Sequence, residues 1–164
     1  EAGTRIVHMI AAAPDTRWLF ATRGGYGFAA GLGDLFSRNK AGKQFITLEE
    51  GDAILRPVPL LAGADKVALL SGKGKFLVFG LDEVKVQPGG GPGTILMGLD
   101  DKDGLAQVVP IGAGGLRATG VYRNKPTEDV LAGKELGPYL GKRARKGRLL
   151  DVRPKDPVLS PVIA

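Results

Sequence analysis

The segment 139–155, YLGKRARKGRLLDVRPK, carries seven basic side chains and a single acidic one, Asp151. Lysine and arginine at this density can neutralise the phosphates of a nucleic acid, meet an anionic membrane surface, act as a targeting signal or form a solvated surface. Glycines within the segment let the main chain approach a phosphate closely and free its N–H groups for phosphate oxygens. The segment is therefore the first candidate for contact with a polyanion.

A second basic segment, 36–43 (FSRNKAGK), follows a predicted hairpin in the same way as 137–148 does. Basic side chains that recur along one rim suit a phosphate backbone better than base edges, so binding is predicted to be independent of DNA sequence. The alternative is a pair of solvated charged loops, and the corresponding segment 85–93 carries only Lys85. The main predicted phosphate contacts are Arg38, Lys40, Lys43, Lys142, Arg143, Arg145, Lys146 and Arg148. The secondary candidates are Lys73, Lys75, Arg23, Arg117, Arg123 and Lys125.

No catalytic or metal site is predicted in this chain. It has no cysteine and one histidine, His8, so thiolate and multi-histidine metal sites are excluded. The loop 87–94 (QPGGGPGT) has no lysine after its last glycine and opens no helical pattern, so it is not a nucleotide-binding loop of the Walker A type. The acidic residues at 100, 101 and 103 lack the glutamate that closes a calcium loop, and they are interpreted as a surface turn.

The excess of positive over negative charge comes from the last third of the chain. Of the 164 residues, 23 are basic and 17 acidic, which gives a net charge of +6. Residues 112–164 hold 11 basic and 5 acidic residues, so they account for the whole excess. No apolar run approaches the roughly 18 residues that a membrane span needs. A cytoplasmic protein with a polyanionic partner is expected.

The elements that must position these charges are short strands separated by glycine and proline. Two-stranded hairpins are predicted at 17–35, 66–84 and 115–136, with short helical turns near 33–36 and 133–136. Each hairpin is preceded by an apolar strand (residues 5–10 before the first) and followed by a glycine-rich or basic segment and a further strand, such as 44–48 or 94–99. The fold class is therefore all-β.

These elements recur about every 50 residues. Thr22 and Ser71 are 49 positions apart, and Gly42, Gly93 and Gly147 are separated by 51 and 54. Four-stranded units in such a series predict a propeller-like array of three visible blades, at about 4–52, 53–104 and 105–164. A β-barrel or sandwich with accidental periodicity is the alternative. The chain is expected to be one DNA-binding domain, 1–164, and a fragment of a longer subunit.

Four stretches in this order resemble a known family: FATRGGYGF, DLFSRNKAGKQFITL, DGLAQVVPI and LGKRARKGRLL. They resemble the C-terminal domain of the A subunit of bacterial DNA topoisomerase IV and, more distantly, the same domain of DNA gyrase. The resemblance covers the whole chain. The gyrase hallmark, a Gln-Arg-Arg-Gly-Gly-Lys-Gly-like box, is absent, which favours topoisomerase IV.

The resemblance implies a β-pinwheel that binds and bends duplex DNA on its basic edge and directs decatenation and supercoil relaxation. The holoenzyme implied is an ATP-dependent type II topoisomerase, chromosome-associated in the cytoplasm, in which the partners are the remaining domains of the A subunit together with the B subunit. ATP and Mg²⁺ are used elsewhere in that holoenzyme, and no cofactor is expected in this domain. The family's cleaving tyrosine lies in another domain, so Tyr26, Tyr122 and Tyr139 receive no catalytic role.

Two other functions remain open on the sequence. A propeller-like module could present its basic rim to an acidic protein partner, in which case it would not retard DNA at low salt. An enzyme could hold a small ligand at the glycine-rich loop 87–94, which would require a concave pocket with converging polar groups.

Overall fold

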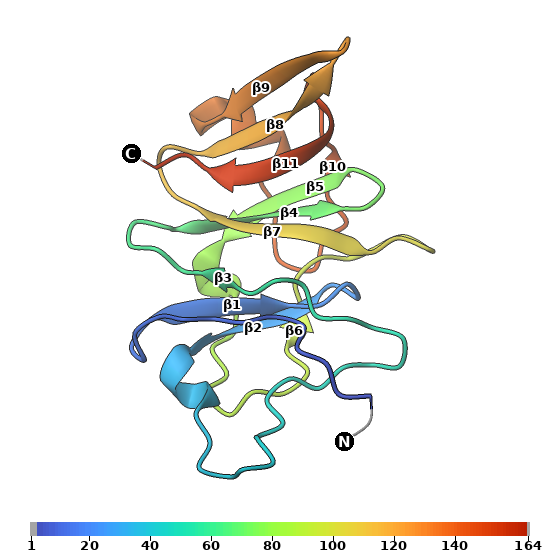
Figure 1. Cartoon of the computed structure of the whole chain (residues 1–164). Helices are drawn as coiled ribbons and strands as arrows, with labels where there is room; N and C mark the ends of the chain where they lie inside the picture. Colours follow the sequence, from blue (N-terminus) through green and yellow to red (C-terminus); the bar gives the residue numbers. More distant parts are fainter. Residues whose placement is uncertain (1–2, 164) are drawn as a thin grey trace.

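Three antiparallel sheets are stacked along one axis in the computed structural model, which describes residues 3–163 (Figure 1). We call them blades 1, 2 and 3. Blade 1 contains β1 (Arg17–Ala21), β2 (Tyr26–Gly31), β3 (Val58–Pro59) and β6 (Thr94–Ile95). Blade 2 contains β4 (Lys66–Ser71), β5 (Lys75–Gly80), β7 (Leu105–Ile111) and β10 (Arg148–Leu149). Blade 3 contains β8 (Leu116–Tyr122), β9 (Lys125–Leu131) and β11 (Lys155–Pro161). The predicted all-β array of three blades is confirmed, and blades 1 and 2 have the predicted four strands, whereas blade 3 has three among the described residues.

The centre of each blade is a hairpin, at the three places that the sequence predicts: β1–β2, β4–β5 and β8–β9. The first two turns use a glycine with positive φ, Gly25 at 87° and Gly74 at 82°. The third turn places Arg123 and Asn124 at φ 48° and 62°, the two positive values that a type I′ turn requires. Short 3₁₀ helices follow the hairpins: η1 (Leu32–Leu35), η2 (Leu81–Glu83) and η3 (Gly133–Tyr139).

The strands that flank each hairpin come from the following sequence repeat. In blade 1, β1 pairs with β3 and β2 pairs with β6, and both outer strands lie within residues 53–104. In blade 2, β4 pairs with β7 and β5 pairs with β10, which both lie within residues 105–164. The repeat boundaries predicted at 4–52, 53–104 and 105–164 therefore describe repeats of the sequence, and the sheets cut across them.

Two predicted strands are absent because they have no hairpin to pair with. The run 5–10 (RIVHMI) forms no strand, and Ile6 and Met9 are each 80% exposed. The strands β7 and β11 correspond to the run 5–10 in later repeats. Each of them pairs with the first strand of the hairpin that precedes it in the chain. The run 44–48 forms only a single bridge, between Ile46 and Gly91. Both predictions of a strand are wrong for the described structure.

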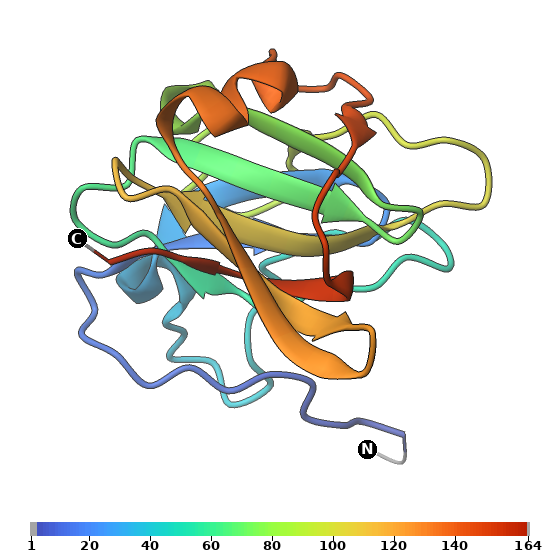
Figure 2. The same cartoon turned by 90° about the horizontal axis from the view of Figure 1, so that it is seen from above.

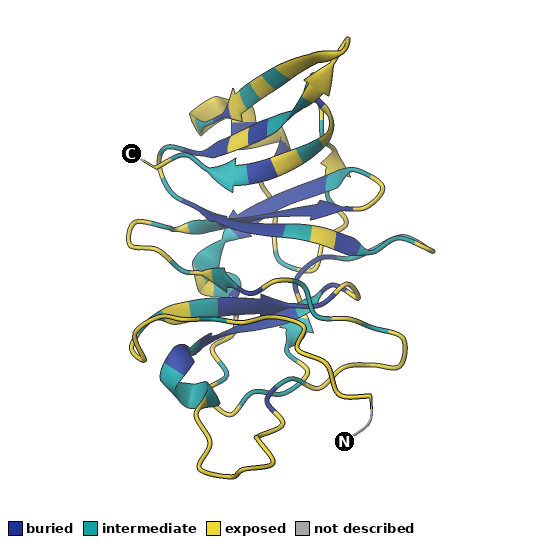
Figure 3. Ribbon diagram, in the orientation of Figure 1, coloured by how far each residue is buried: buried dark blue, intermediate teal, exposed yellow. Residues whose placement is uncertain are grey.

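The core lies between the blades (Figure 3), and blade 2 is the most deeply buried. Leu19 of blade 1 packs against Leu69, Leu77 and Phe79 of blade 2. On the other face of blade 2, Phe76 and its neighbours pack against Leu116, Ala118, Leu131 and Leu159 of blade 3. Each blade thus supplies half of a core that its neighbour completes, as stacked repeats require.

The face of blade 3 that points away from blade 2 is different in character. It carries Arg117 and Glu128, whose side chains form an ion pair at 3.7 Å. By strand register, these residues replace Ala68 and Phe76 of blade 2, which are fully buried against blade 3. Charged side chains at these positions keep this face of blade 3 compatible with water.

Gln107 of β7 joins blade 2 to blade 3 through its side-chain amide. Its Nε2 donates to the carbonyl of Pro157 at 2.8 Å, and its Oε1 accepts from the N–H of Leu159 at 2.8 Å. We expect Gln107→Leu to lower the free energy of unfolding by about 1–3 kcal/mol, because both β11 groups would lose their partner at a part-buried site. Chemical denaturation measures this difference.

A matched control is Gln87→Leu. The side-chain amide oxygen of Gln87 is buried and has no hydrogen-bond partner among residues 3–163. Replacing Gln87 by leucine therefore breaks no hydrogen bond to that oxygen. The effect of this substitution should be clearly smaller. An equal loss of stability in the two variants would contradict a special role for Gln107.

Candidate nucleic-acid interface

The most basic stretch of the chain runs along the outer edges of blades 1 and 2. We call residues 140–149 the rim segment. It is fixed to blade 2 by the N–H of Gly141, which donates to the carbonyl of Val78 at 2.9 Å. It is fixed to blade 1 by two bonds, from Ala144 N–H to the Leu96 carbonyl (2.9 Å) and from Gly98 N–H to the Arg145 carbonyl (3.0 Å). The rim segment therefore bridges the two blades, and its backbone is held in place.

Glycines allow this close approach. A Cβ at Gly98 would lie 2.9 Å from the carbonyl oxygen of Ala144, and one at Gly147 would lie 2.4 Å from that of Phe76. Gly147 also has a φ of 72°, in the region that favours glycine. The glycines of the rim segment and its neighbour thus serve backbone packing.

The basic side chains of the rim segment differ in whether they already have a partner within the protein. Lys142, Arg145 and Arg148 are exposed and take part in no ion pair among residues 3–163. Arg143 is half-buried, and its Nη1 donates to the carbonyl of Ile95 at 2.6 Å. Lys146 forms an ion pair with Asp100, with 2.6 Å between Nζ and Oδ1. Three of the five predicted contacts in this segment are thus unpaired, and two already have partners in the protein.

The tip of the second hairpin and Lys146 both contact the acidic turn at residues 100–103. Lys73 Nζ donates to the carbonyl of Asp101 at 2.5 Å, which draws the tip towards the 100–103 turn. The pKa of the Asp100 carboxyl is lowered, first by its hydrogen bond and charge interaction with Lys146 and then by the charges of Lys75 and Lys73. Three ammonium groups from two distant segments therefore act on a single carboxylate.

The three hairpin tips lie on one side of the stack, at the right in Figures 1 and 2. Each tip presents a basic residue, and Arg23, Lys73 and Arg123 are 50 positions apart in the sequence. Asp52 shapes the first tip by accepting from the N–H of Gly24 at 2.8 Å, and Asp103 does the same for Lys73 at 3.1 Å. The acidic residues Asp52 and Asp103 therefore have a structural role in the turns.

The other predicted residues are spread more widely. Residues 36–43 form an exposed loop at the blade 1 end of the stack, where Lys43 Nζ donates to the carbonyl of Asp34 at 2.9 Å. No hydrogen bond or ion pair within residues 3–163 joins this loop to the rim segment. The segment 85–93 instead follows the edge of blade 1, through a bridge between Ala29 and Val86. It occupies the position on blade 1 that the rim segment occupies on blade 2.

The loop 87–94 is packed against its neighbours. A Cβ at Gly90 would lie 2.0 Å from the carbonyl oxygen of Phe45, and one at Gly93 would lie 2.6 Å from that of Gly27. These glycines therefore serve close contact between segments, which weakens the case for a ligand site there. Among residues 3–163, no group of three or more aspartate, glutamate or histidine side chains could hold a metal ion. Within the same residues, no helix has the length and apolar character to cross a membrane.

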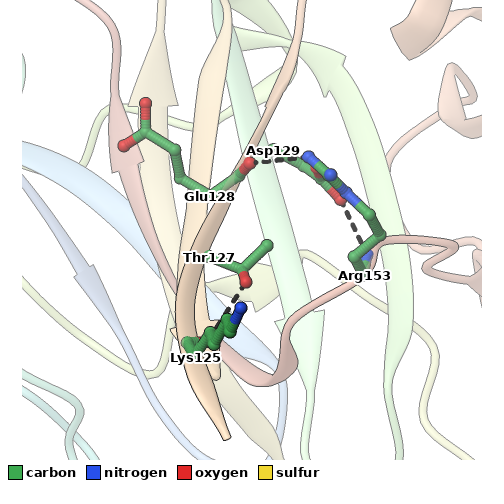
Figure 4. A network of polar contacts seen from close by, with 5 residues as sticks. All are labelled: Lys125, Thr127, Glu128, Asp129 and Arg153. Atoms are coloured by element: carbon green, nitrogen blue, oxygen red, sulfur yellow. Dashed lines mark hydrogen bonds and ion pairs between the residues drawn. The ribbon is translucent and has the colours of Figure 1, made fainter. Parts of the chain in front are cut away.

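Arg153 belongs to the basic stretch of the sequence but has a different environment (Figure 4). Its guanidinium pairs with the carboxylate of Asp129, and its Nη2 also donates to the carbonyl of Glu128 at 3.1 Å. The hydrogen bonds and charge of Arg153 lower the pKa of Asp129. Arg153 thus links the segment before β11 to β9, and its guanidinium is already paired within the protein.

The sequence missed the part played by Asp100. The acidic turn lies at the surface, as the sequence predicts, but nothing in its spacing indicates that Lys146, 46 residues away, is the partner of Asp100. The only feature of the sequence that could have indicated this ion pair is the presence of an acidic turn and strongly basic segments in the same chain.

Comparison with known proteins places this arrangement in a family. The family model described as "DNA gyrase C-terminal domain, beta-propeller" matches residues 17–59 and 65–111. The A subunit of DNA topoisomerase 4 from Escherichia coli K12 is 29% identical over 154 residues, which cover 90% of this chain and 20% of that protein. The same protein from Neisseria gonorrhoeae is 28% identical over 164 residues, covering 93% of this chain and 20% of that protein. The chain thus spans about a fifth of the length of these relatives.

Solved structures agree. The E. coli ParC C-terminal domain superposes with a TM-score of 0.81 at 26% identity, over 97% of this chain and 66% of that one. A DNA gyrase A C-terminal domain, at 20% identity and a TM-score of 0.64 over 82% of this chain and 43% of that one, shares the fold. The resemblance to topoisomerase IV C-terminal domains that the sequence predicted is confirmed. The chain belongs to the DNA gyrase C-terminal domain family, and its three blades are a beta-propeller array of that family.

Proposed function

We propose that the chain binds double-stranded DNA on the surface formed by the rim segment and the hairpin tips, without reading its sequence. The observation that carries the proposal is the set of unpaired cations on the rim segment: Lys142, Arg145 and Arg148 are exposed on a backbone held by two blades. Cations on a fixed backbone can neutralise successive phosphates with little loss of conformational freedom. The three basic hairpin tips, which lie together on one side of the stack, would add further phosphate contacts.

The proposal extends to the enzyme in which such a domain acts. The relatives are named as the A subunit of DNA topoisomerase 4. We infer that this chain serves as a DNA-binding domain of a type II topoisomerase, and that its partners are the remaining domains of the A subunit together with the B subunit. ATP and Mg²⁺ would be used by other domains of that enzyme, which acts on chromosomal DNA in the cytoplasm. The domain itself would bend a duplex segment and so direct decatenation and supercoil relaxation.

The test is a titration of the 164-residue chain with linear and supercoiled duplex DNA over a series of salt concentrations. The affinity should fall linearly on a log–log plot, with a slope of roughly −0.9 for each phosphate neutralised, and should be similar for unrelated sequences. Single-molecule or fluorescence measurements of end-to-end distance on a short duplex would report bending. Absence of binding at low salt would overturn the proposal and favour an acidic protein partner.

A further inference from the structure

We propose that Asp100 is a built-in competitor of DNA phosphate: it occupies the cluster of Lys73, Lys75 and Lys146 in the free domain, and bound DNA takes its place. This inference rests on the proposed function, because it concerns how the same surface accepts DNA. It assigns a regulatory role to a carboxylate on a surface that otherwise attracts polyanions.

The geometry supports an exchangeable contact. The Nζ of Lys146 lies 2.6 Å from Oδ1 of Asp100, and the two side chains remain 66% and 37% exposed. An ion pair so open to water contributes little to the stability of the fold. A phosphodiester that approaches the surface can therefore take over Lys146 without unfolding any element.

The carboxylate of Asp100 differs from those of Asp52 and Asp103 because it accepts no hydrogen bond from a main-chain N–H of the described residues. The Asp103 carboxylate accepts from the N–H groups of Lys73 and Gly104, and the Asp52 carboxylate accepts from those of Gly24 and Ala53. For Asp100, the only side-chain bond among residues 3–163 is the one to Lys146. Its main-chain carbonyl, which accepts from the N–H of Asp103, would remain after a change of the side chain.

The position of Asp100 gives it influence over two parts of the proposed interface. Lys146 belongs to the rim segment, whereas Lys73 and Lys75 belong to the second hairpin tip and its β5 strand. Lys146 pairs directly with Asp100, and the charges of Lys75 and Lys73 also lower the pKa of the Asp100 carboxyl. A phosphate at this point would meet the repulsion of the carboxylate as well as the attraction of the lysines. Removing the carboxylate should therefore strengthen binding.

The experiment compares Asp100→Asn with the unchanged 164-residue chain in DNA titrations over a salt series. Asparagine has nearly the same shape, so the turn is kept. We expect the affinity to rise by about threefold to tenfold near 0.1 M salt, and the log–log slope to steepen by up to roughly 0.9, since one more cation is available to a phosphate. The control is Asp15→Asn, which removes the same charge from an exposed turn that has no ion pair within residues 3–163. Its effect on affinity should be much smaller.

A second variant tests whether the effect passes through Lys146. In a Lys146→Gln background, Asp100→Asn should add clearly less affinity than it does to the unchanged chain. Equal gains in both backgrounds, or equal gains from the Asp100 and Asp15 variants, would overturn the inference while leaving DNA binding intact. If the unchanged chain does not bind DNA at low salt, the proposed function itself fails, so the two failures can be told apart.

Discussion

Replacing Arg143, Arg145, Lys146 and Arg148 together by alanine is expected to weaken DNA binding by about three orders of magnitude near 0.1 M salt. If all four side chains contact phosphates, the log–log slope of affinity against salt should flatten by about 3 to 4 units, since each contact releases roughly 0.9 counterion. The four side chains are expected to contribute unequally to DNA affinity. Arg145 and Arg148 are unpaired, whereas Arg143 and Lys146 must first give up the Ile95 carbonyl and the Asp100 carboxylate.

The control for this variant removes the same charge outside the rim segment and the hairpin tips. Arg17 and Lys66 begin β1 and β4, Arg56 precedes β3 at the edge of blade 1 opposite to β6, and Lys134 lies in η3. Their joint replacement by alanine should change the slope far less. An unchanged slope after the loss of the four rim cations would reject the rim segment as the DNA contact. Circular dichroism on both variants would check that the blades remain folded.

The largest effect on stability is expected for Phe76→Ala, at about 3–5 kcal/mol of unfolding free energy. Phe76 is fully buried between blades 2 and 3, and its ring centroid lies 5.0 Å from that of Tyr139 in an edge-to-face arrangement. Its loss would leave a cavity in a core that the two blades share, and neither blade can fill it alone. Denaturant titration followed by fluorescence or circular dichroism measures the difference.

Phe76 also supports the rim segment, because its main chain pairs with Arg148 of β10. The Phe76→Ala variant should therefore lose DNA affinity at temperatures where the blade contact begins to open. Phe36→Ala serves as the control, since Phe36 is 63% exposed and its removal should change stability by less than about 0.5 kcal/mol. A loss below about 1 kcal/mol for Phe76→Ala would contradict the shared-core description.

The hairpins could be predicted from the sequence because their signals are local. Alternating apolar residues and a turn such as Ser71–Gly74 specify pairing between neighbours in the chain. The same is true of the roughly 50-residue repeat and of the charge on 139–155, which are properties of residue order alone. The fold class, the family and the basic character of the segment 139–155 could therefore be predicted from the sequence.

Tertiary structure alone decided which strands share a sheet. An outer strand such as β6 or β10 is two residues long and sits beside a hairpin from the preceding repeat. Because all repeats have nearly the same spacing, pairing within a repeat and pairing across repeats fit the sequence equally well. The run 5–10 has strand propensity but forms no strand. A strand also needs the edge of another strand to pair with, and propensity alone does not supply that edge.

The same distinction holds for the proposed DNA surface. The sequence alone determined that cations are concentrated at 139–155, since charge is a property of each residue. Whether a cation is free depends on what lies within a few ångströms, which the chain determines only by folding. Folding brought Asp100 to Lys146 and Asp129 to Arg153, and it left Arg145 and Arg148 unpaired. The physical reason is the short range of ion pairing in water, which acts between neighbours in space and ignores distance along the chain.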